Sequence, residues 1–239
     1  VNDQLVAEMI QAQPGTGRAE SLCRLAHQER EPGHSTRALE YAMLATIEAE
    51  RSIERVALPG ALLELTRAQH QTQDLEGAIR SGLRGISLVS DKDLQKRPQI
   101  LFEMAAISLE LHNPVRALEY LAEVGNLPDH QTQDRMTKLR LEAEARKTIL
   151  APTALLQWLS SHINEAIEHG DPATEVDFLA KLATAHASTG DTLRAMELEE
   201  HVLAVALKHG QAIQAGIAAN NLAELTSIKI AGAKKMELY

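Results

Sequence analysis

The chain has 239 residues, enough for one or two domains with a sizeable core. Hydrophobic residues make up 44% of it and aromatic residues only 3%, which favours closely packed helices over a β-sandwich. The formal net charge of −9 and the lack of a Lys/Arg cluster disfavour nucleic acid and anionic membrane surfaces as partners. No apolar run is long enough to cross a bilayer, so we expect no membrane insertion by this segment.

A single cysteine, Cys23, excludes an internal disulfide and a cysteine-based metal cluster. It leaves the compartment open between cytoplasm and periplasm, because a disulfide-free fold is stable in both. The sequence begins at Val1 rather than Met, which we interpret as a segment of a longer protein. A removed signal peptide and a boundary inside the gene product both fit this beginning.

A short phrase recurs along the chain at a near-constant spacing. Arg-Ala-Leu-Glu-Tyr occupies 37–41 and again 116–120, with variants at 77–81, 194–198 and 234–238. One residue of each phrase serves as an anchor, and Ala154 fills a gap of double length, so that successive anchors lie about 40 residues apart. The anchors are Ala38, Ala78, Ala117, Ala154, Ala195 and Met236. A period kept over six units predicts a repeat array.

A second set of positions accompanies the anchors. Twelve residues before four of them stands a small residue that follows Leu or Met. The pairs are Leu25–Ala26, Leu65–Thr66, Met104–Ala105 and Leu182–Ala183. Two antiparallel helices approach to about 8 Å only where both present small side chains, so each unit is predicted to be a helical hairpin. The fourth and sixth repeats depart from the pattern, since Glu142 and Glu224 occupy the position of the small residue.

Turn residues separate the two predicted helices of each hairpin. They occupy 31–34, 71–74, 112–114 and 189–191. Ser35, Asp74 and Asp191 are the expected N-caps of the helices that follow. The remaining prolines fall near the turns between hairpins, where proline does not interrupt a helix. These prolines are Pro14, Pro59, Pro98, Pro128 and Pro172.

This combination of Leu and a small residue on a first helix, with Ala twelve residues later on a second, resembles the tetratricopeptide repeat family. The resemblance covers roughly residues 20–239 and is closest to the long-period repeats of bacterial signalling proteins. It implies an all-α fold, a right-handed superhelical solenoid of about six antiparallel helical hairpins. The whole chain, 1–239, would then be one helical-repeat domain whose last repeat is incomplete.

No set of residues in the sequence indicates catalysis. The ten histidines form no His-Glu-x-x-His motif, and the glycines at 14–18 lack the Lys and Ser/Thr of a phosphate loop. The acidic runs at 142–146 and 197–201 are interpreted as solvated helix faces. We therefore expect no catalytic residues, no metal, no cofactor and no enzyme activity. A helical phosphorelay protein with a phosphorylatable His186 is the less favoured alternative.

The resemblance also implies a partner-binding groove on the first helices of successive units. Carrying the family's groove positions over by the matched register selects His27, Arg67, Gln71, Phe102, Ala106 and Thr184. Asn220 and Asn221 also resemble the groove asparagines that some family members use on peptide backbones. Because the middle of this groove is apolar and small, an amphipathic peptide or helix suits it better than an acidic tail.

The expected function is therefore that of a non-catalytic scaffold that binds a protein or peptide. The resemblance points to the sensory or interaction region of a larger bacterial signalling protein. A stand-alone peptide-responsive regulator or adaptor is the alternative. An uncovered C-terminal end with Ala231, Met236 and Leu238 would also favour self-association, since repeat arrays need polar caps.

Overall fold

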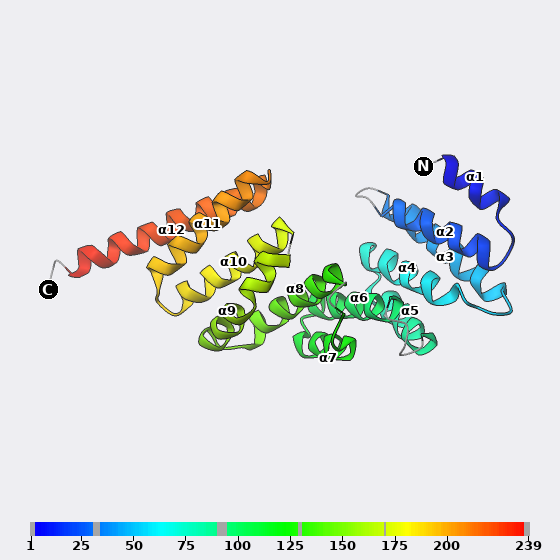
Figure 1. Ribbon diagram of the computed structural model, residues 1–239, viewed down its shortest axis with the longest axis horizontal. Coiled ribbons are helices and arrows are strands. Elements are labelled where there is room, and N and C mark those ends of the chain that lie inside the picture. The colour runs from blue at the N-terminus through cyan, green and yellow to red at the C-terminus, as the bar shows by residue number, and fades with distance from the viewer. Residues whose placement is uncertain (1–2, 31–33, 90–94, 129–130, 170, 237–239) are drawn as a thin grey trace. The chain divides into compact units, whose positions relative to one another are not determined.

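The computed structural model describes residues 3–30, 34–89, 95–128, 131–169 and 171–236, with only the backbone at 3, 5 and 231–236. Helices account for 84% of the residues in these ranges, and no strand occurs among them (Figure 1). The all-α helical-repeat solenoid expected from the sequence is confirmed. The helices are α1 (Asp3–Gln11), α2 (Thr16–Gln28), α3 (Ser35–Arg51), α4 (Leu58–Gln71), α5 (Leu75–Leu88), α6 (Lys96–Glu110), α7 (Pro114–Val124), α8 (Thr132–Ile149), α9 (Pro152–His169), α10 (Pro172–Ser188), α11 (Thr192–Lys208) and α12 (Ala212–Met236).

The chain divides into two compact units, Val1–Asn126 and Leu127–Tyr239, called unit 1 and unit 2 below. In unit 1 the hairpins are α2/α3, α4/α5 and α6/α7, and α1 packs on α2. In unit 2 the hairpins are α8/α9 and α10/α11, and α12 packs on α11. The first helices of neighbouring hairpins also touch, α2 with α4 and α4 with α6 in unit 1, and α8 with α10 in unit 2. The single domain over 1–239 stays a prediction.

The small residues of the repeat lie where the helices cross. Ala26 and Ala38 belong to one buried cluster between α2 and α3. The equivalent residues of the other regular hairpins are also almost completely buried. They are Thr66 with Ala78, Ala105 with Ala117, and Ala183 with Ala195. The twelve-residue register is therefore confirmed for these four hairpins, because a larger side chain at either position would separate the two helices.

Short polar side chains cap the N-termini of several helices. Asp74 accepts a hydrogen bond from the backbone N–H of Gly77, and Asp191 accepts one from Arg194, as expected of N-caps. Asn113 caps α7 in the same way. The expectation for Ser35 is wrong, since the N-cap of α3 is His34, whose side chain makes no capping hydrogen bond. The predicted turn at 31–33 lies outside the described residues.

The fourth hairpin has a different register from the one predicted. Ala154, taken as its anchor, is exposed, whereas Leu155 and Leu159 on the same helix are buried. On the partner helix α8 the buried small residues are Ala143 and Ala145. The sequence has Glu142 at the expected small position. A shift of one residue pairs Ala143 with Leu155, which are also twelve residues apart and are both buried.

The predicted sixth hairpin is wrong. The helix α12 continues without a break from Ala212 to Met236, through the region where a turn and a second helix were expected. No proline follows Pro172 in the sequence, so nothing interrupts the backbone hydrogen bonds of this segment. The side chains of Ala231, Met236 and Leu238, on which the prediction of self-association depends, lie outside the described residues.

Candidate functional site

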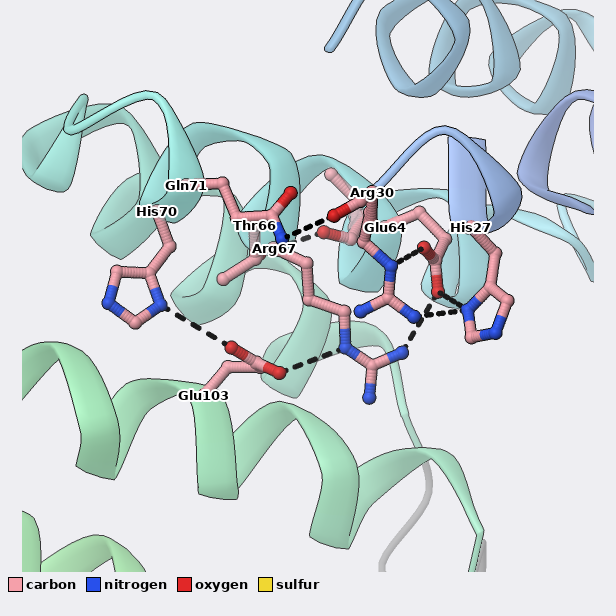
Figure 2. Close-up of polar contacts among 9 residues, drawn as sticks. His27, Arg30, Glu64, Thr66, Arg67, His70, Gln71 and Glu103 are labelled. Atoms are coloured by element: carbon pink, nitrogen blue, oxygen red, sulfur yellow. Dashed lines mark hydrogen bonds and ion pairs between the residues drawn. The ribbon is translucent and has the colours of Figure 1, made fainter. Parts of the chain in front are cut away.

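Three successive first helices of unit 1 bring charged side chains together in one network (Figure 2). This inner network consists of His27 and Arg30 near the end of α2, Glu64, Arg67 and His70 on α4, and Glu103 and Glu110 on α6. Arg67 is its centre: Nε donates to Glu103 and Nη1 donates to Glu64, both at 2.9 Å. The side chain of Arg67 is 17% exposed. The guanidinium therefore links α4 to α6 while remaining at the surface.

The α2 side of the inner network is arranged around Glu64. Its Oε2 lies 3.5 Å from Nε of Arg30, and Oε1 lies 4.0 Å from Nδ1 of His27. Arg30 also lies against the ring of His27 (Figure 2). Burial, followed by the positive charge of Arg30, lowers the pKa of His27. We therefore expect His27 to be neutral near pH 7.

The α6 side of the inner network pairs one histidine with two carboxylates. Nδ1 of His70 lies 3.5 Å from Glu103 and Nε2 lies 3.0 Å from Glu110. The contact with Glu103 raises the pKa of His70 above its usual value, although burial opposes it. Burial acts to raise the pKa of Glu103, but His70 and Arg67 outweigh it and lower that pKa. The positive and negative groups of the network thus stabilise one another.

The predicted groove residues of unit 1 have different environments. His27 and Arg67 belong to the inner network, and Gln71 lies at its edge, where Nε2 donates to the backbone oxygen of Arg30 at 3.2 Å. Ala106 is half-buried. Phe102 is only 7% exposed, so it acts as a core residue of unit 1 rather than as a contact for a ligand. The predicted apolar centre of the groove is therefore closed in this unit.

Cys23 lies on the same helix as His27 and is half-buried. Burial, followed by the negative charge of Glu64, raises the pKa of its thiol to about 12. A thiol with this pKa carries almost no thiolate near neutral pH and is a poor nucleophile. Cys23 also packs against a buried cluster of unit 1, so its environment is that of a packing residue.

Unit 2 contains a cavity of about 440 Å³. Its walls come from α8, the start of α9, α10 and α12, and we call it the unit-2 cavity. It is lined by Glu144, Lys147, Leu150, Pro152, Leu155, Asp177, Ala180, Lys181, Thr184, Ala185, Ser188, Ile217 and Asn221. Two predicted groove residues, Thr184 and Asn221, are therefore brought together here. Asn220 is exposed and does not line the cavity.

The charges on the cavity wall are compensated within the wall. Lys181 on α10 is only 9% exposed, contacts Asp177 one turn earlier, and lies 3.2 Å from Glu144 on α8. Glu144 also lies 3.9 Å from Lys147. These two acids and two bases leave the wall without a strong net charge. Leu150, Leu155 and Ile217 supply apolar surface beside it.

The neutral polar side chains of the cavity already make some hydrogen bonds within the protein. The hydroxyl of Thr184 donates to the backbone oxygen of Ala180 at 2.9 Å, which leaves its oxygen able to accept. Nδ2 of Asn221 donates to Oε1 of Glu199 on α11 at 2.9 Å. Glu199 is 3% exposed, and burial raises the pKa of its carboxyl group, although the Asn221 hydrogen bond opposes this.

Two residues of this site were missed from the sequence. Glu199 belongs to the acidic run at 197–201, which was interpreted as a solvated face, and for Glu199 that interpretation is wrong. Lys181 was not selected either. The available signal for Glu199 was its place in the periodic pattern, four residues after the buried anchor Ala195 and three before the buried Val202.

Other kinds of site find little support in the described ranges. No group of three or more His, Cys, Asp or Glu side chains there is arranged to hold a metal ion. His186 is 17% exposed, and its Nδ1 lies 3.2 Å from Asp191, the N-cap of the next helix. This is a structural setting rather than that of a freely exposed phosphoacceptor. Among the residues that the structure describes, no helix combines the length and apolar character of a membrane span.

Solved structures similar to this chain are helical-repeat proteins. TPR-like repeats of a kinesin light chain-like protein from Podosopora anserina share 19% identity, with a TM-score of 0.65 over 81% of this chain and 97% of theirs. A STAND protein with a tetratricopeptide repeat sensor from Pyrococcus horikoshii shares 16% identity, with a TM-score of 0.60 over 87% of this chain and 37% of that one. A Rap protein complexed with competence and sporulation factor shares 11% identity, with a TM-score of 0.58 over 99% and 75%.

No protein-family model matches the sequence, and no curated protein matches it significantly. At these identities the similarity concerns the fold. The similar proteins are built from the same kind of helical hairpin that the small-residue register predicts here. The chain therefore has the fold of the tetratricopeptide-type helical-repeat proteins.

Proposed function

We propose that the chain is a non-catalytic scaffold that binds a peptide segment of a partner protein in the unit-2 cavity. The observation that carries the proposal is the composition of this cavity. Its volume of about 440 Å³ lies in the range of protein ligand pockets. Apolar surface at Leu150, Leu155 and Ile217 stands beside the polar groups of Thr184 and Asn221. A peptide offers the same combination of apolar side chains and hydrogen-bonding backbone groups.

The charge arrangement favours an amphipathic segment without a large net charge. Lys181 is already paired with Asp177 and Glu144, so it has little capacity to hold an added carboxylate. Glu144 and Asp177 are in turn paired with Lys147 and Lys181, so they have little capacity to hold a strongly basic ligand. The earlier expectation of an amphipathic peptide is therefore kept, with the contact moved from Phe102 to the unit-2 cavity.

His27, Arg67 and Gln71 are proposed as a separate partner contact on unit 1. Arg67 uses Nε and Nη1 within the inner network. In Figure 2 its third nitrogen, Nη2, has no dashed contact to the other residues drawn, and we propose that it donates to an acceptor on a partner. His27 and Gln71 are exposed on either side of it. This contact is weaker in our proposal, because a partner there competes with ion pairs that already exist.

We further propose that the scaffold serves signalling, as the sensory or interaction region of a larger bacterial protein. The proposal is supported by two proteins of this fold. One carries its tetratricopeptide repeats as a sensor within a signal-transduction ATPase, and the other was solved with competence and sporulation factor bound. The cavity and the absence of a convergent set of acid, base and nucleophile in the described residues fit such a role.

The test is a selection of random dodecapeptides displayed on phage against the immobilised chain. Peptides that are enriched are synthesised, and their affinities are measured by fluorescence polarisation. Asn221→Ala and Asn220→Ala form a matched pair, since the two residues are neighbours on α12 and only Asn221 lines the cavity. We expect Asn221→Ala to weaken binding roughly threefold to tenfold, as for one lost hydrogen bond, and Asn220→Ala to bind like the wild type.

Three outcomes would contradict the proposal. One is a selection with no enrichment over a chain that carries Ile217→Glu, which places a charge on the cavity lining. A second is equal binding by wild type and Asn221→Ala for every enriched peptide. The third is loss of all binding in Arg67→Ala, which would mean that the partner contact lies on unit 1.

A further inference from the structure

The carboxyl group of Glu199 is buried in unit 2 with one hydrogen-bond partner among the described residues. The residue lies on α11 and is 3% exposed. Its Oε1 accepts from Nδ2 of Asn221 on α12 at 2.9 Å. In the part of the chain that the structure describes, no donor reaches the buried Oε2. Burying a carboxyl group with an unsatisfied oxygen destabilises a fold relative to an apolar side chain of similar size. A contribution to stability therefore does not explain why a glutamate stands at this position.

The geometry suggests another role for Glu199, which concerns the donor nitrogen and the acceptor oxygen of the Asn221 amide. An asparagine side chain has a donating nitrogen and an accepting oxygen of nearly the same shape, and the hydrogen-bond network decides which end points where. Glu199 offers an acceptor in both its ionised and its protonated form, because the protonated acid retains a carbonyl oxygen. It therefore attracts Nδ2 to α11. The oxygen Oδ1 is left for the cavity that Asn221 lines.

We propose that Glu199 is a positioning residue, which holds the Asn221 amide so that Oδ1 accepts an N–H donated by a ligand in the unit-2 cavity. The inference rests on the proposed peptide-binding function and adds the chemistry of one contact. The ligand group at this point is a hydrogen-bond donor, and a backbone amide N–H of the peptide supplies one. Without Glu199 the amide would be free to rotate, and half of its orientations would present Nδ2 to that donor.

The experiment compares two substitutions at the same residue. Glu199→Gln keeps an acceptor oxygen for Asn221, removes the charge and replaces the other oxygen with an NH2 group, whereas Glu199→Met has a similar size and removes the acceptor. The probe is a dodecapeptide enriched by the phage selection, measured by fluorescence polarisation. We expect Glu199→Met to weaken binding about threefold to tenfold and Glu199→Gln to stay close to wild type. The thermal midpoint of Glu199→Met should equal or exceed that of the wild type, because a buried unsatisfied group is removed.

A second measurement follows the Asn221 amide itself. In a nitrogen-15 NMR spectrum, the side-chain NH2 signals of Asn221 are assigned by their loss in Asn221→Ala. We expect these signals to shift strongly in Glu199→Met and weakly in Glu199→Gln. Binding by Glu199→Met in the Asn221→Ala background should equal that of Asn221→Ala alone, since Glu199 acts only through Asn221.

Each possible failure has a distinct meaning. Wild-type affinity in Glu199→Met overturns the positioning role, even where Asn221→Ala shows that the cavity binds the peptide. Equal losses in Glu199→Met and Glu199→Gln assign the effect to charge and overturn it as well. A further loss in the Asn221→Ala background shows that Glu199 acts by another route. A selection without cavity-dependent peptides contradicts the proposed function itself, and the NMR signals then still report whether the hydrogen bond exists.

Discussion

The two units present different inner surfaces although they are built from the same repeat. In unit 1 the first helices α2, α4 and α6 are joined by a network in which Arg67 contacts two carboxylates on two helices. In unit 2 the first helices α8, α10 and α12 border a cavity of about 440 Å³. Long charged side chains that reach a neighbouring helix occupy the groove themselves. In unit 2 a pair also joins two helices, Lys181 on α10 with Glu144 on α8, but space remains beside it next to Leu150, Leu155 and Ile217.

The hairpins of the two units also differ in how regularly they follow the repeat pattern. The three regular hairpins of unit 1 keep Ala or Thr at both crossing positions, and they pack closely. The irregular fourth hairpin, α8/α9, has Leu155 at its shifted crossing position. Leu155 and its neighbours Leu150 and Pro152 also line the unit-2 cavity. The departure from the repeat pattern therefore coincides with the wall of the proposed ligand site.

The largest expected effect compares two anchor positions. Ala117→Leu in unit 1 should lower the free energy of unfolding by about 3 kcal/mol, because Ala117 has no exposed surface and the added atoms separate α6 from α7. Ala154→Leu, at the same predicted position of the fourth repeat, should change it by less than about 0.5 kcal/mol, since Ala154 is exposed. Urea denaturation followed by circular dichroism measures both. Equal losses would show that the shifted register of α8/α9 is wrong.

A smaller effect is expected from removing the centre of the inner network. Arg67→Ala leaves Glu64 and Glu103 without their shared cation, and both carboxylates are largely buried. We expect a loss of about 1–2 kcal/mol, below the value for a fully buried pair, because Arg67 retains some contact with solvent. The double variant with Glu103→Gln should recover part of this loss. No recovery would mean that Arg67 stabilises unit 1 by packing rather than by charge.

The stability of unit 1 should depend on pH because of His70. Its pKa is raised in the folded protein by the contact with Glu103, so its contribution to stability is present below the unfolded value near 6.5 and is lost as pH rises through the folded pKa. His27 acts in the opposite sense, because its pKa is lowered. The measurement is therefore a difference: wild type should gain more stability than His70→Gln between pH 8 and pH 6. A pH-independent difference would contradict the arrangement around Glu103.

The smallest effect concerns two equivalent surface pairs. Arg116 contacts Glu119 in unit 1 and Arg194 contacts Glu197 in unit 2, each at 2.6 Å and three residues apart in the recurring phrase. Both pairs are exposed, and such pairs contribute little to stability. Glu119→Ala and Glu197→Ala should therefore leave the unfolding midpoint unchanged in both units. A clear loss in only one of them would show that this face is covered in that unit.

The residues of the proposed site show which features the sequence can predict and which it cannot. Thr184 and Asn221 were placed on the first helices by the repeat register, and both line the unit-2 cavity. Phe102 was placed by the same register and is buried, because its ring fills space within unit 1. The register predicts the face of a helix on which a residue lies. It does not predict whether a neighbouring helix covers that face.

The sequence by itself determined the four regular helical hairpins of this protein, because their signals are local. Small residues twelve apart, such as Ala26 and Ala38, and caps such as Asp74 and Asp191 act within a single hairpin. Only the tertiary structure decided the inner surfaces. Arg67 and Glu103 are 36 residues apart, and Glu199 and Asn221 are 22 apart and on different helices. Such pairs depend on the rotation and spacing of whole helices, which many weak contacts decide together.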